Sequence, residues 1–352
     1  MAQRSKLITE QVCVIALVVV YLSGFISIKP PASKLTMRWK PPEWLAIGDS
    51  SAVVEKTVII VIDALRSDHL ATATNPSMPY LYNLLQEGGA KGYVVHTASP
   101  TVTLPRIKSL VTGSIPGFMD VIVNFGAQEM KEDNLIERWA TQGKRMQFYG
   151  DETWLKLFPT PFTKYDPVTS FFVADYTEVD KNVTRHLSSV LESGDWDVLI
   201  LHYLGLDHIG HLAGPQSPLI LPKLIEMDTV IRDIHMGLLN QSSDFLMLIC
   251  GDHGMSDAGG HGGSSLEEIT TSALFISNKL PKNSIVGGET IKQVSLAGTL
   301  ALLSGVDIPS GNIGAPVAGI LAALDPVHRM AAHHKAAAQL LRAATVAKAP
   351  RT

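Results

Sequence analysis

The stretch Val58-Ile59-Ile60-Val61-Ile62 decides the fold class of this chain. Five consecutive β-branched residues form an unbroken apolar run, which is typical of a parallel strand buried on both faces of a sheet. Similar short runs recur at residues 147–149, 198–202, 245–250 and 273–276. Between the runs lie segments with the pattern of amphipathic helices, at residues 80–86, 104–112, 134–141, 178–191, 219–239 and 291–303. Strands that alternate with helices predict an α/β fold with a doubly wound, mainly parallel sheet and helices on both faces.

The composition indicates a folded protein that does not use nucleic acid as its main partner. Of the 352 residues, 46% are apolar and 18% are charged, and the net charge is only −4. This length allows one large domain or two small ones. A nucleic-acid-binding chain would carry a basic patch or run, and no long run of either sign is present. A disulfide between Cys13 and Cys250 is not expected, because one cysteine lies in an apolar N-terminal run and the other ends an apparent strand.

An uncharged apolar segment, residues 12–28, stands near the N-terminus. With extension back to Leu7 it reaches the roughly 17–25 residues that span a bilayer. A cleaved signal peptide is the alternative, but no clear small-x-small cleavage site follows, which favours a retained anchor. We therefore expect an anchor at residues 1–28, a proline-containing connector at 29–56, a folded domain at 57–322 and an Ala-rich, basic helix or tail at 323–352.

The orientation of the folded domain is indicated in two opposing ways. More positive charges follow the apolar segment than precede it, which favours a cytoplasmic domain, but long domains translocate largely regardless of such charges. Two N-glycosylation sequons, at Asn182 and Asn240, favour the lumenal side.

Metal-ligand residue types follow three of the predicted strands. Asp63 follows the first, Asp207 and His211 follow the strand at 198–202, and Asp252-His253 follow the strand at 245–250, with His261 further along the same glycine-rich loop. Each has an ordinary alternative, such as a helix cap, a surface histidine or a turn residue. However, ligands gather at the carboxyl ends of parallel strands, so the repetition favours one shared site.

The spacing of these residues divides them into two groups. Asp207 and His211 are four residues apart, so in a helical turn they face the same way and can hold one ion, with His261 as a third ligand. Asp63, Asp252 and His253 remain for a second ion. Mixed carboxylate and imidazole ligands suit Zn²⁺ best and Mn²⁺ next. Two such ions about 4 Å apart would clamp the attacking and leaving oxygens of a displacement at phosphorus.

The stretch SPTVTLPR, residues 99–106, offers a nucleophile for such a displacement. Thr103 lies where a helix is predicted to begin, with Pro105 in its first turn. Backbone N–H groups at a helix N-terminus bind phosphate oxygens, and a nearby metal would lower the pKa of the hydroxyl. The alternative is that Thr103 only caps the helix. With the metal ligands nearby, Thr103 is our first choice of nucleophile, ahead of Thr101.

The order of the candidate site residues along the chain resembles that of the alkaline phosphatase superfamily: Asp63, Thr103, Asp207-x-x-x-His211, Asp252-His253 and His261. The resemblance implies an alkaline-phosphatase-like fold and two zinc sites. Asp207, His211 and His261 would bind one zinc ion, and Asp63, Thr103, Asp252 and His253 would bind the other. Asn124 falls at the spacing at which nucleotide pyrophosphatase/phosphodiesterase relatives place an amide donor for phosphoryl oxygens. Arg106 and His208 are further candidates for contacts to the donor substrate.

Four longer stretches, residues 100–118, 148–159, 170–187 and 195–218, resemble the GPI ethanolamine phosphate transferases. The middle two look most like the member that modifies the second mannose. The resemblance implies an enzyme of the endoplasmic reticulum membrane with a lumenal catalytic domain. It would transfer phosphoethanolamine from phosphatidylethanolamine to a mannose of a GPI-anchor precursor, and it would associate with a small membrane partner subunit.

Members of this family continue past the catalytic domain into many transmembrane helices, so we expect this chain to represent part of such a protein. Two other functions stay open from the residues alone. A metal-dependent phosphodiesterase or phosphatase would use the same metal ligands with water as the acceptor. A membrane-anchored interaction module without catalysis would not need them.

Overall fold

The computed structural model describes residues 52–71, 77–116, 129–280, 289–322 and 324–348. An eight-stranded sheet forms the centre of the described chain, in the order β4-β3-β5-β1-β6-β7-β2-β8. The strands are β1 (Lys56–Ile62), β2 (Ala90–His96), β3 (Met146–Asp151), β4 (Phe162–Val168), β5 (Val198–Tyr203), β6 (Phe245–Cys250), β7 (Thr270–Ser277) and β8 (Thr290–Lys292). β7 is antiparallel to its neighbours β6 and β2, and the other pairings are parallel. The mainly parallel sheet predicted from the sequence is therefore confirmed.

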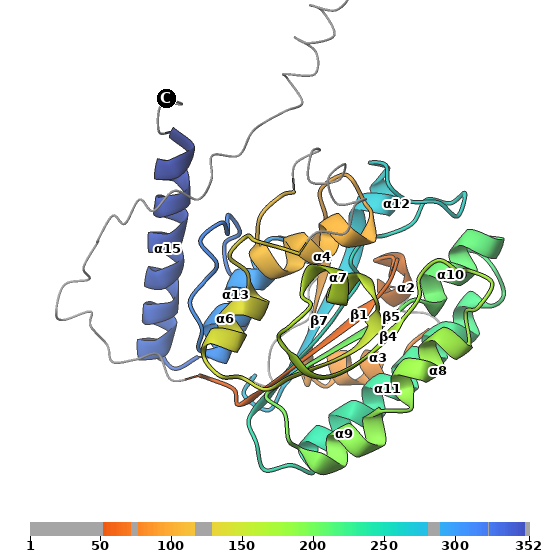
Figure 1. Cartoon of the computed structure of the whole chain (residues 1–352), viewed down its shortest axis with the longest axis horizontal. Coiled ribbons are helices and arrows are strands. Elements are labelled where there is room, and N and C mark those ends of the chain that lie inside the picture. The colour runs from red at the N-terminus through yellow and green to blue at the C-terminus, as the bar shows by residue number, and fades with distance from the viewer. Residues whose placement is uncertain (1–51, 72–76, 117–128, 281–288, 323, 349–352) are drawn as a thin grey trace, which may run out of the picture.

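β1 lies between β5 and β6, and all seven of its residues are buried. Because side chains alternate along a strand, Ile59 and Val61 enter the core on one face, whereas Val58, Ile60 and Ile62 enter the core on the other. Helices cover both faces (Figure 1). The continuous apolar run thus follows from burial on both sides.

The two helical layers are made by different parts of the chain. One layer contains α4 (Thr103–Thr112), α6 (Leu135–Thr141), α7 (Thr153–Leu157) and α13 (Ser295–Ser304), and the opposite layer contains α3 (Pro79–Gln86), α8 (Glu178–Thr184), α9 (Leu187–Ser193) and α11 (Ile220–Leu239). The remaining described helices are α2 (Asp68–Ala71), α10 (Gly205–Ala213), α12 (Leu266–Ile269), α14 (Ala318–Leu321) and α15 (Pro326–Lys348). The predicted wrapping of helices around both faces is confirmed.

Several predicted boundaries were wrong. The single helix expected at residues 178–191 is two helices, α8 and α9, which are interrupted at Arg185 and His186. The expected helix at 291–303 begins only at Ser295, because residues 290–292 form β8 instead. β2, β4 and β8 were not predicted at all. β4 has the sequence FTKYDPV and buries only its two end residues fully, so this edge strand lacks the apolar run that marks a central one.

The predicted membrane anchor at residues 1–28 and most of the connector lie outside the described residues. Within the described ranges, none of the helices has both the length and the apolar character that crossing a membrane requires. α15 occupies most of the predicted C-terminal helix or tail.

Candidate metal and phosphoryl-transfer site

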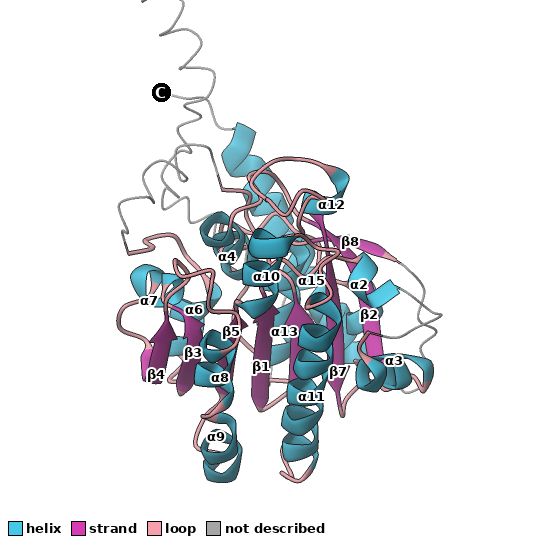
Figure 2. Cartoon of the chain, turned by 90° about the vertical axis from the view of Figure 1, so that its right-hand side faces the viewer, coloured by secondary structure: helices cyan, strands magenta, loops and turns pink. Residues whose placement is uncertain are grey.

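The ends of β1, β5 and β6 bring the predicted ligands to one edge of the sheet. Asp63 directly follows β1, His211 lies on α10 after β5, and Asp252 follows β6. α4, α10 and α12 gather at this same end of the sheet (Figure 2). β5 and β6 flank β1 in parallel register, so the loops after all three strands must lie next to each other.

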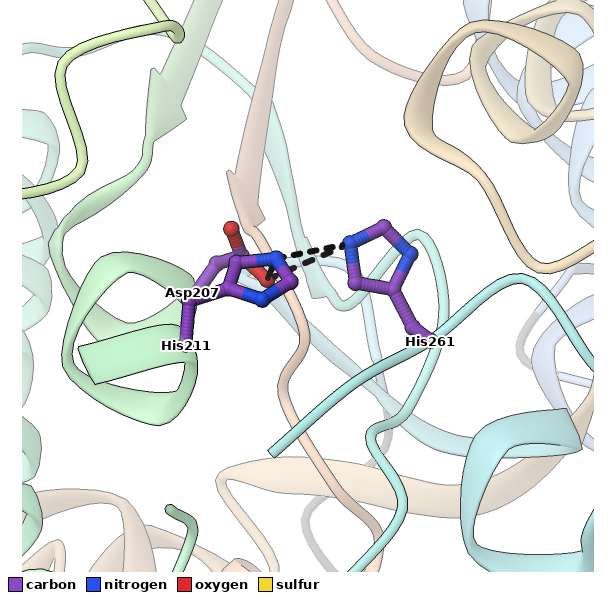
Figure 3. A group of neighbouring side chains, drawn as sticks. All are labelled: Asp207, His211 and His261. Carbon is purple, nitrogen blue, oxygen red and sulfur yellow. Dashed lines mark hydrogen bonds and ion pairs between the residues drawn. The ribbon is translucent and has the colours of Figure 1, made fainter. Parts of the chain in front are cut away.

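Asp207, His211 and His261 form one group of facing ligand atoms (Figure 3). His211 Nε2 lies 3.3 Å and His261 Nε2 lies 3.6 Å from Asp207 Oδ1. The two Nε2 atoms are 3.0 Å apart. The i,i+4 spacing on α10 places Asp207 and His211 on one side, as the sequence predicted, and the loop after β6 supplies His261 from the other side.

Asp63, Asp252 and His253 form the second group, and all three are almost completely buried. His253 Nε2 lies 3.4 Å from Asp63 Oδ1 and 3.3 Å from Asp252 Oδ2. Asp252 Oδ1 accepts a hydrogen bond from the backbone N–H of Ala64, which has a positive φ of 56°. This left-handed conformation is uncommon outside glycine and directs the N–H towards the carboxylate.

The two groups lie side by side, and within the described part of the chain their buried ligand atoms lack the partners that bound cations would supply. The rings of His253 and His261, one from each group, stack with their centroids 4.1 Å apart. Four buried ligand atoms have no hydrogen-bond partner among the described residues: Asp63 Oδ1, Asp207 Oδ1, Asp252 Oδ2 and His253 Nε2. Leaving buried polar atoms unpaired costs free energy, and a metal ion at each group would satisfy them. The donor set of oxygen and nitrogen atoms therefore fits divalent metal ions.

The histidine hydrogen bonds leave the metal-facing nitrogens free to act as ligands. His261 Nδ1 lies 2.7 Å from the backbone oxygen of Thr101, and His253 Nδ1 lies 2.9 Å from that of Gly254. A carbonyl only accepts, so each Nδ1 carries the proton and each Nε2 keeps its lone pair. Burial lowers the pKa of His211, His253 and His261, which favours the neutral imidazole that binds metal.

The buried carboxyl groups of Asp63 and Asp207 hold protons more strongly than usual when no metal is bound. Burial raises the pKa of Asp207 to about 8, and the negative charge of Asp252 adds to the shift. Burial also raises the pKa of Asp63 well above its usual value, again with Asp252 contributing. Binding of divalent metal would neutralise the crowded charges and displace these protons.

When metal is removed with a chelator, we expect the free energy of unfolding to fall as the pH rises from about 6.5 to about 8. In this window the unfolded chain has released the Asp207 proton, because an ordinary aspartate has a pKa of about 3.9, whereas the folded chain still holds it. The folded state thus binds more protons, and each extra proton lowers the free energy of unfolding by up to about 1.4 kcal/mol per pH unit. Below about pH 6.5 the histidines have the opposite effect on the free energy of unfolding, because their pKa values are lowered in the folded state and the unfolded chain binds the extra protons.

Chemical denaturation across this pH range, with and without saturating Zn²⁺, measures the effect. Zinc is expected to remove the fall, because its ligands are already ionised. A metal-free stability that rises between pH 6.5 and 8 would contradict the protonation of Asp207.

The hydroxyl of Thr103 faces the second group of ligands. Thr103 is the first residue of α4, and its Oγ1 lies 3.4 Å from Asp63 Oδ2. The N-cap residue is Val102, so Thr103 does not cap this helix. At the start of α4 the first backbone N–H groups have no partners within the helix, which provides donors for an anionic ligand.

Thr101, the second choice of nucleophile, is fully buried and holds the loop that carries His261. Its Oγ1 donates to the backbone oxygen of Gly263 at 3.0 Å and accepts from the N–H of Gly262 at 2.9 Å. Gly259 has a φ of 83°, and a Cβ there would lie 2.5 Å from the backbone oxygen of Gly210 in α10. A glycine at this position therefore lets the loop pack closely against the helix that carries Asp207.

The secondary candidates lie in different surroundings. Arg106 is fully buried, its Nη1 donates to Gln293 Oε1 at 3.4 Å, and burial lowers its pKa to about 10. Gln293 in turn donates to the backbone oxygen of Asp252 at 2.6 Å. His208 is also buried, and its Nδ1 donates to the backbone oxygen of Asp175 at 2.6 Å. Contact of Arg106 and His208 with a donor substrate stays a prediction, and Asn124 lies outside the described residues.

His202 is a site residue that the sequence interpretation missed. It is fully buried at the end of β5, and its Nε2 lies 3.6 Å from Asp63 Oδ2. Trp154 Nε1 donates to His202 Nδ1 at 3.1 Å. An indole only donates, so the proton of the neutral imidazole must be on Nε2, facing Asp63. This tautomer is the opposite of that in His253 and His261, so His202 Nε2 turns a proton rather than a lone pair towards Asp63, at a distance longer than a hydrogen bond.

We expect His202→Leu to weaken zinc binding by about 10- to 100-fold, because Asp63 loses the N–H that faces it across 3.6 Å. His202→Gln, whose side-chain amide can still donate, should restore most of the affinity. Competitive titration of Zn²⁺ against a chromophoric chelator measures both variants, and circular dichroism checks that they are folded. Unchanged zinc affinity in folded His202→Leu would show that His202 does not orient Asp63.

The two sequons differ in their accessibility. Asn182 lies within α8, is partly buried, and is followed by Thr184, whose Oγ1 contacts Tyr203 Oη at 3.4 Å. Asn240 is exposed at the C-terminal end of α11. Asn240 therefore offers the more open acceptor of the two.

Two curated relatives show where the similarity extends. The human protein named GPI ethanolamine phosphate transferase 2, catalytic subunit, is 50% identical over 266 residues, which cover 74% of this chain and 27% of the relative. The Schizosaccharomyces pombe protein named GPI ethanolamine phosphate transferase 2 is 41% identical over 323 residues, which cover 84% of this chain and 41% of the relative. The chain thus spans less than half the length of either relative. The expected resemblance to the GPI ethanolamine phosphate transferases is confirmed.

Three solved structures share the fold. The Neisseria meningitidis lipooligosaccharide phosphoethanolamine transferase A has a TM-score of 0.57 and 12% identity, and the match covers 78% of this chain and 58% of that one. The C-terminal periplasmic domain of Escherichia coli EptC, in complex with Zn, has a TM-score of 0.54, 13% identity and coverage of 74% and 85%. Murine ectonucleotide pyrophosphatase/phosphodiesterase 5 has a TM-score of 0.54, 14% identity and coverage of 72% and 96%.

The sequence model of one family matches residues 57–154 and 153–279, which make up more than half of the chain. The matched residues include Thr103, both ligand groups and His202. The chain belongs to the type I phosphodiesterase / nucleotide pyrophosphatase family, within the alkaline phosphatase superfamily.

Proposed function

We propose that this chain is the catalytic region of an enzyme that transfers phosphoethanolamine from phosphatidylethanolamine to a mannose of a GPI-anchor precursor. We infer that the acceptor is the second mannose, because residues 148–159 and 170–187 look most like the member of the family that modifies it. The observation that supports chemistry of this kind is the Thr103 hydroxyl, which lies 3.4 Å from Asp63 of the second ligand group. The groups would hold two Zn²⁺ ions, with Mn²⁺ as the second choice.

In the first displacement, Thr103 Oγ1 attacks the phosphorus of the lipid and forms an O–P bond, while the P–O bond to diacylglycerol breaks. Asp63 Oδ2 accepts the hydrogen bond of the attacking hydroxyl and orients its lone pair. The hydroxyl proton leaves with diacylglycerol. The backbone N–H groups at the start of α4 bind the phosphoryl oxygens, and the product is phosphoethanolamine linked to Thr103.

In the second displacement, a mannose hydroxyl attacks the same phosphorus, and the bond to Thr103 Oγ1 breaks. The mannose proton returns to the threonine oxygen, which restores the enzyme. When bound, the metal ions supply the positive charge that lowers the pKa of a hydroxyl and offsets the charge on the phosphoryl oxygens. Asp207, His211 and His261 would hold one ion, and Asp63, Asp252 and His253, together with Thr103, would hold the other.

Hydrolysis is the alternative outcome, because water in place of mannose would release free phosphoethanolamine. The fate of head-group label from phosphatidylethanolamine distinguishes the two reactions. Transfer predicts that addition of a mannose-containing GPI precursor moves the label to the precursor and lowers the amount of free phosphoethanolamine. Label that is released as phosphoethanolamine at the same rate with and without the precursor would favour the phosphodiesterase.

The same proposal places the protein in the endoplasmic reticulum membrane with this domain in the lumen and a small membrane subunit as a partner. The exposed Asn240 sequon supports the lumenal side. An N-glycan on Asn240 would agree with this placement, whereas digestion of the domain by protease outside sealed microsomes would contradict it.

A further inference from the structure

A pocket of about 260 Å³ lies at the edge of the sheet, separate from the two ligand groups. Its lining residues come from the end of the edge strand β4, from α8 and from the loop that joins them. Val168 and Val179 are buried residues of its apolar wall. Phe172, Asn182 and other lining residues come from residues 170–187, one of the stretches that resembles the enzyme acting on the second mannose.

The polar wall of the pocket is held in place by its own contacts. Arg185 Nη2 and His186 Nε2 lie 2.6 Å and 2.9 Å from Asp166 Oδ2. The His186 ring stacks on Tyr149 with the centroids 4.3 Å apart. Asp166 and Arg185 remain 35% and 58% exposed, so each keeps polar atoms that a ligand can reach. A preformed wall of donors and acceptors needs little ordering when a ligand binds.

An exposed aromatic ring, that of Phe172, lines the pocket beside this polar wall. Among the described Phe, Tyr and Trp side chains, the exposed ones are Tyr165, Phe171 and Phe172, at 55%, 83% and 64% exposure. Only Phe172 of the three lines the pocket. An exposed ring next to polar groups fits a ligand that has both an apolar face and hydroxyl groups.

The charges of the pocket disfavour an anionic ligand. Two carboxylates, Asp166 and Asp175, line it together with one guanidinium, Arg185, which already pairs with Asp166. A sugar ring meets no such penalty, because its hydroxyl groups can donate to carboxylates and accept from the guanidinium and the Asn182 amide.

The sheet register sets the distance from the pocket to the reaction centre. Pro167 pairs with Gly150, Gly150 pairs with His202, and His202 pairs with Val61, two residues before Asp63. Three steps of about 4.8 Å between neighbouring strands give roughly 14 Å. This distance exceeds the length of a phosphoethanolamine group but lies within the reach of an oligosaccharide of several sugar units.

We propose that the pocket lined by Phe172, Asp166, Asn182 and Arg185 is a glycan subsite that holds a sugar of the acceptor while a mannose lies at Thr103. This assignment rests on the proposed function and specifies how the acceptor is recognised. The ring of Phe172 packs on the apolar face of the sugar, and the polar wall binds its hydroxyl groups. A glycan attached to Asn182 would fill the same space, so the assignment expects Asn182 to be unmodified.

The test uses the full chain and an α-linked mannotriose as the probe, with binding followed by ligand-observed NMR. We expect wild-type protein to bind mannotriose and Phe172→Ala to bind it about tenfold more weakly, through the loss of one aromatic contact. Phe171→Ala is the matched control, since it removes an adjacent exposed ring outside the pocket, and it should bind normally. Asn182→Ala should also weaken binding, and it does so without changing the aromatic surface.

Thr103→Ala separates this inference from the proposed function, because it removes the nucleophile and should still bind mannotriose. If wild type does not become labelled on Thr103 but sugar binding depends on Phe172, only the proposed reaction is contradicted. Equal binding by Phe172→Ala and wild type, or no binding by wild type, would overturn the subsite. An N-glycan on Asn182 would also overturn it. A third contradicting result would be that both phenylalanine variants lose binding to phosphatidylethanolamine vesicles equally while mannotriose binding is unchanged, because this would assign the rings to a membrane surface.

Discussion

Replacement of Thr103 by alanine is expected to abolish transfer of phosphoethanolamine, with a loss of at least about 10³-fold. The expected loss is large because Thr103 Oγ1 is the atom proposed to form the covalent bond to phosphorus, and a metal-activated water lacks its fixed position on α4. Steady-state transfer of labelled head group measures the effect. Metal content should remain that of the wild type, since three other residues surround each metal position.

Two further variants control for this result. Thr103→Ser keeps a hydroxyl at the start of α4 and should retain measurable transfer. Thr101→Ala should act mainly on stability, because Thr101 Oγ1 bonds to Gly262 and Gly263 in the loop that carries His261. Normal transfer by Thr103→Ala would remove Thr103 from the mechanism.

Asp252→Asn is expected to remove one of two bound metal ions and to lower transfer by at least about 10²-fold. Asp252 is fully buried, and one of its oxygens already accepts the N–H of Ala64, so only Oδ2 faces the proposed ion. An amide supplies no negative charge there, and it can place an N–H₂ group against the metal position. The stoichiometry of bound zinc, measured on purified protein, should fall from about two to about one per chain.

Asp257→Asn is the matched control for charge on the same loop. Asp257 is 73% exposed and pairs with Arg66 rather than with either ligand group. Removal of the Asp257 charge is expected to leave the metal content unchanged, because exposed ion pairs contribute little to stability. Two bound zinc ions in Asp252→Asn would contradict the ligand assignment.

The central part of the fold was predictable because burial on both faces imposes an unbroken apolar run on a strand. β1, β5 and β6 carry such runs, and their carboxyl ends carry Asp63, Asp207 and Asp252. The edge strands were not predictable in the same way. β4 exposes most of its residues, so its sequence resembles a loop, and it forms a strand because β3 provides a pairing partner.

The grouping of the ligands could be inferred from spacing and strand ends, but their supporting contacts could not. His202 lies inside a predicted strand, where a histidine is most simply interpreted as part of the core. Its role depends on Trp154, which is 48 residues away and reaches it only because β3 and β5 are neighbours. The signal that could have been used is its position at the carboxyl end of a strand beside the one that leads to Asp63. The break between α8 and α9 gave no comparable signal.

The most direct test of the central claim is to measure the mass of the peptide that contains Thr103. The zinc-loaded chain is first incubated with phosphatidylethanolamine, and the reaction is then quenched in acid. The account predicts an added mass of one phosphoethanolamine group on Thr103, absent from Thr103→Ala and lost again when a mannose-containing acceptor is supplied before the quench. Turnover of the lipid without any adduct on Thr103, or an adduct that forms equally in Thr103→Ala, would contradict the claim that this threonine is the nucleophile.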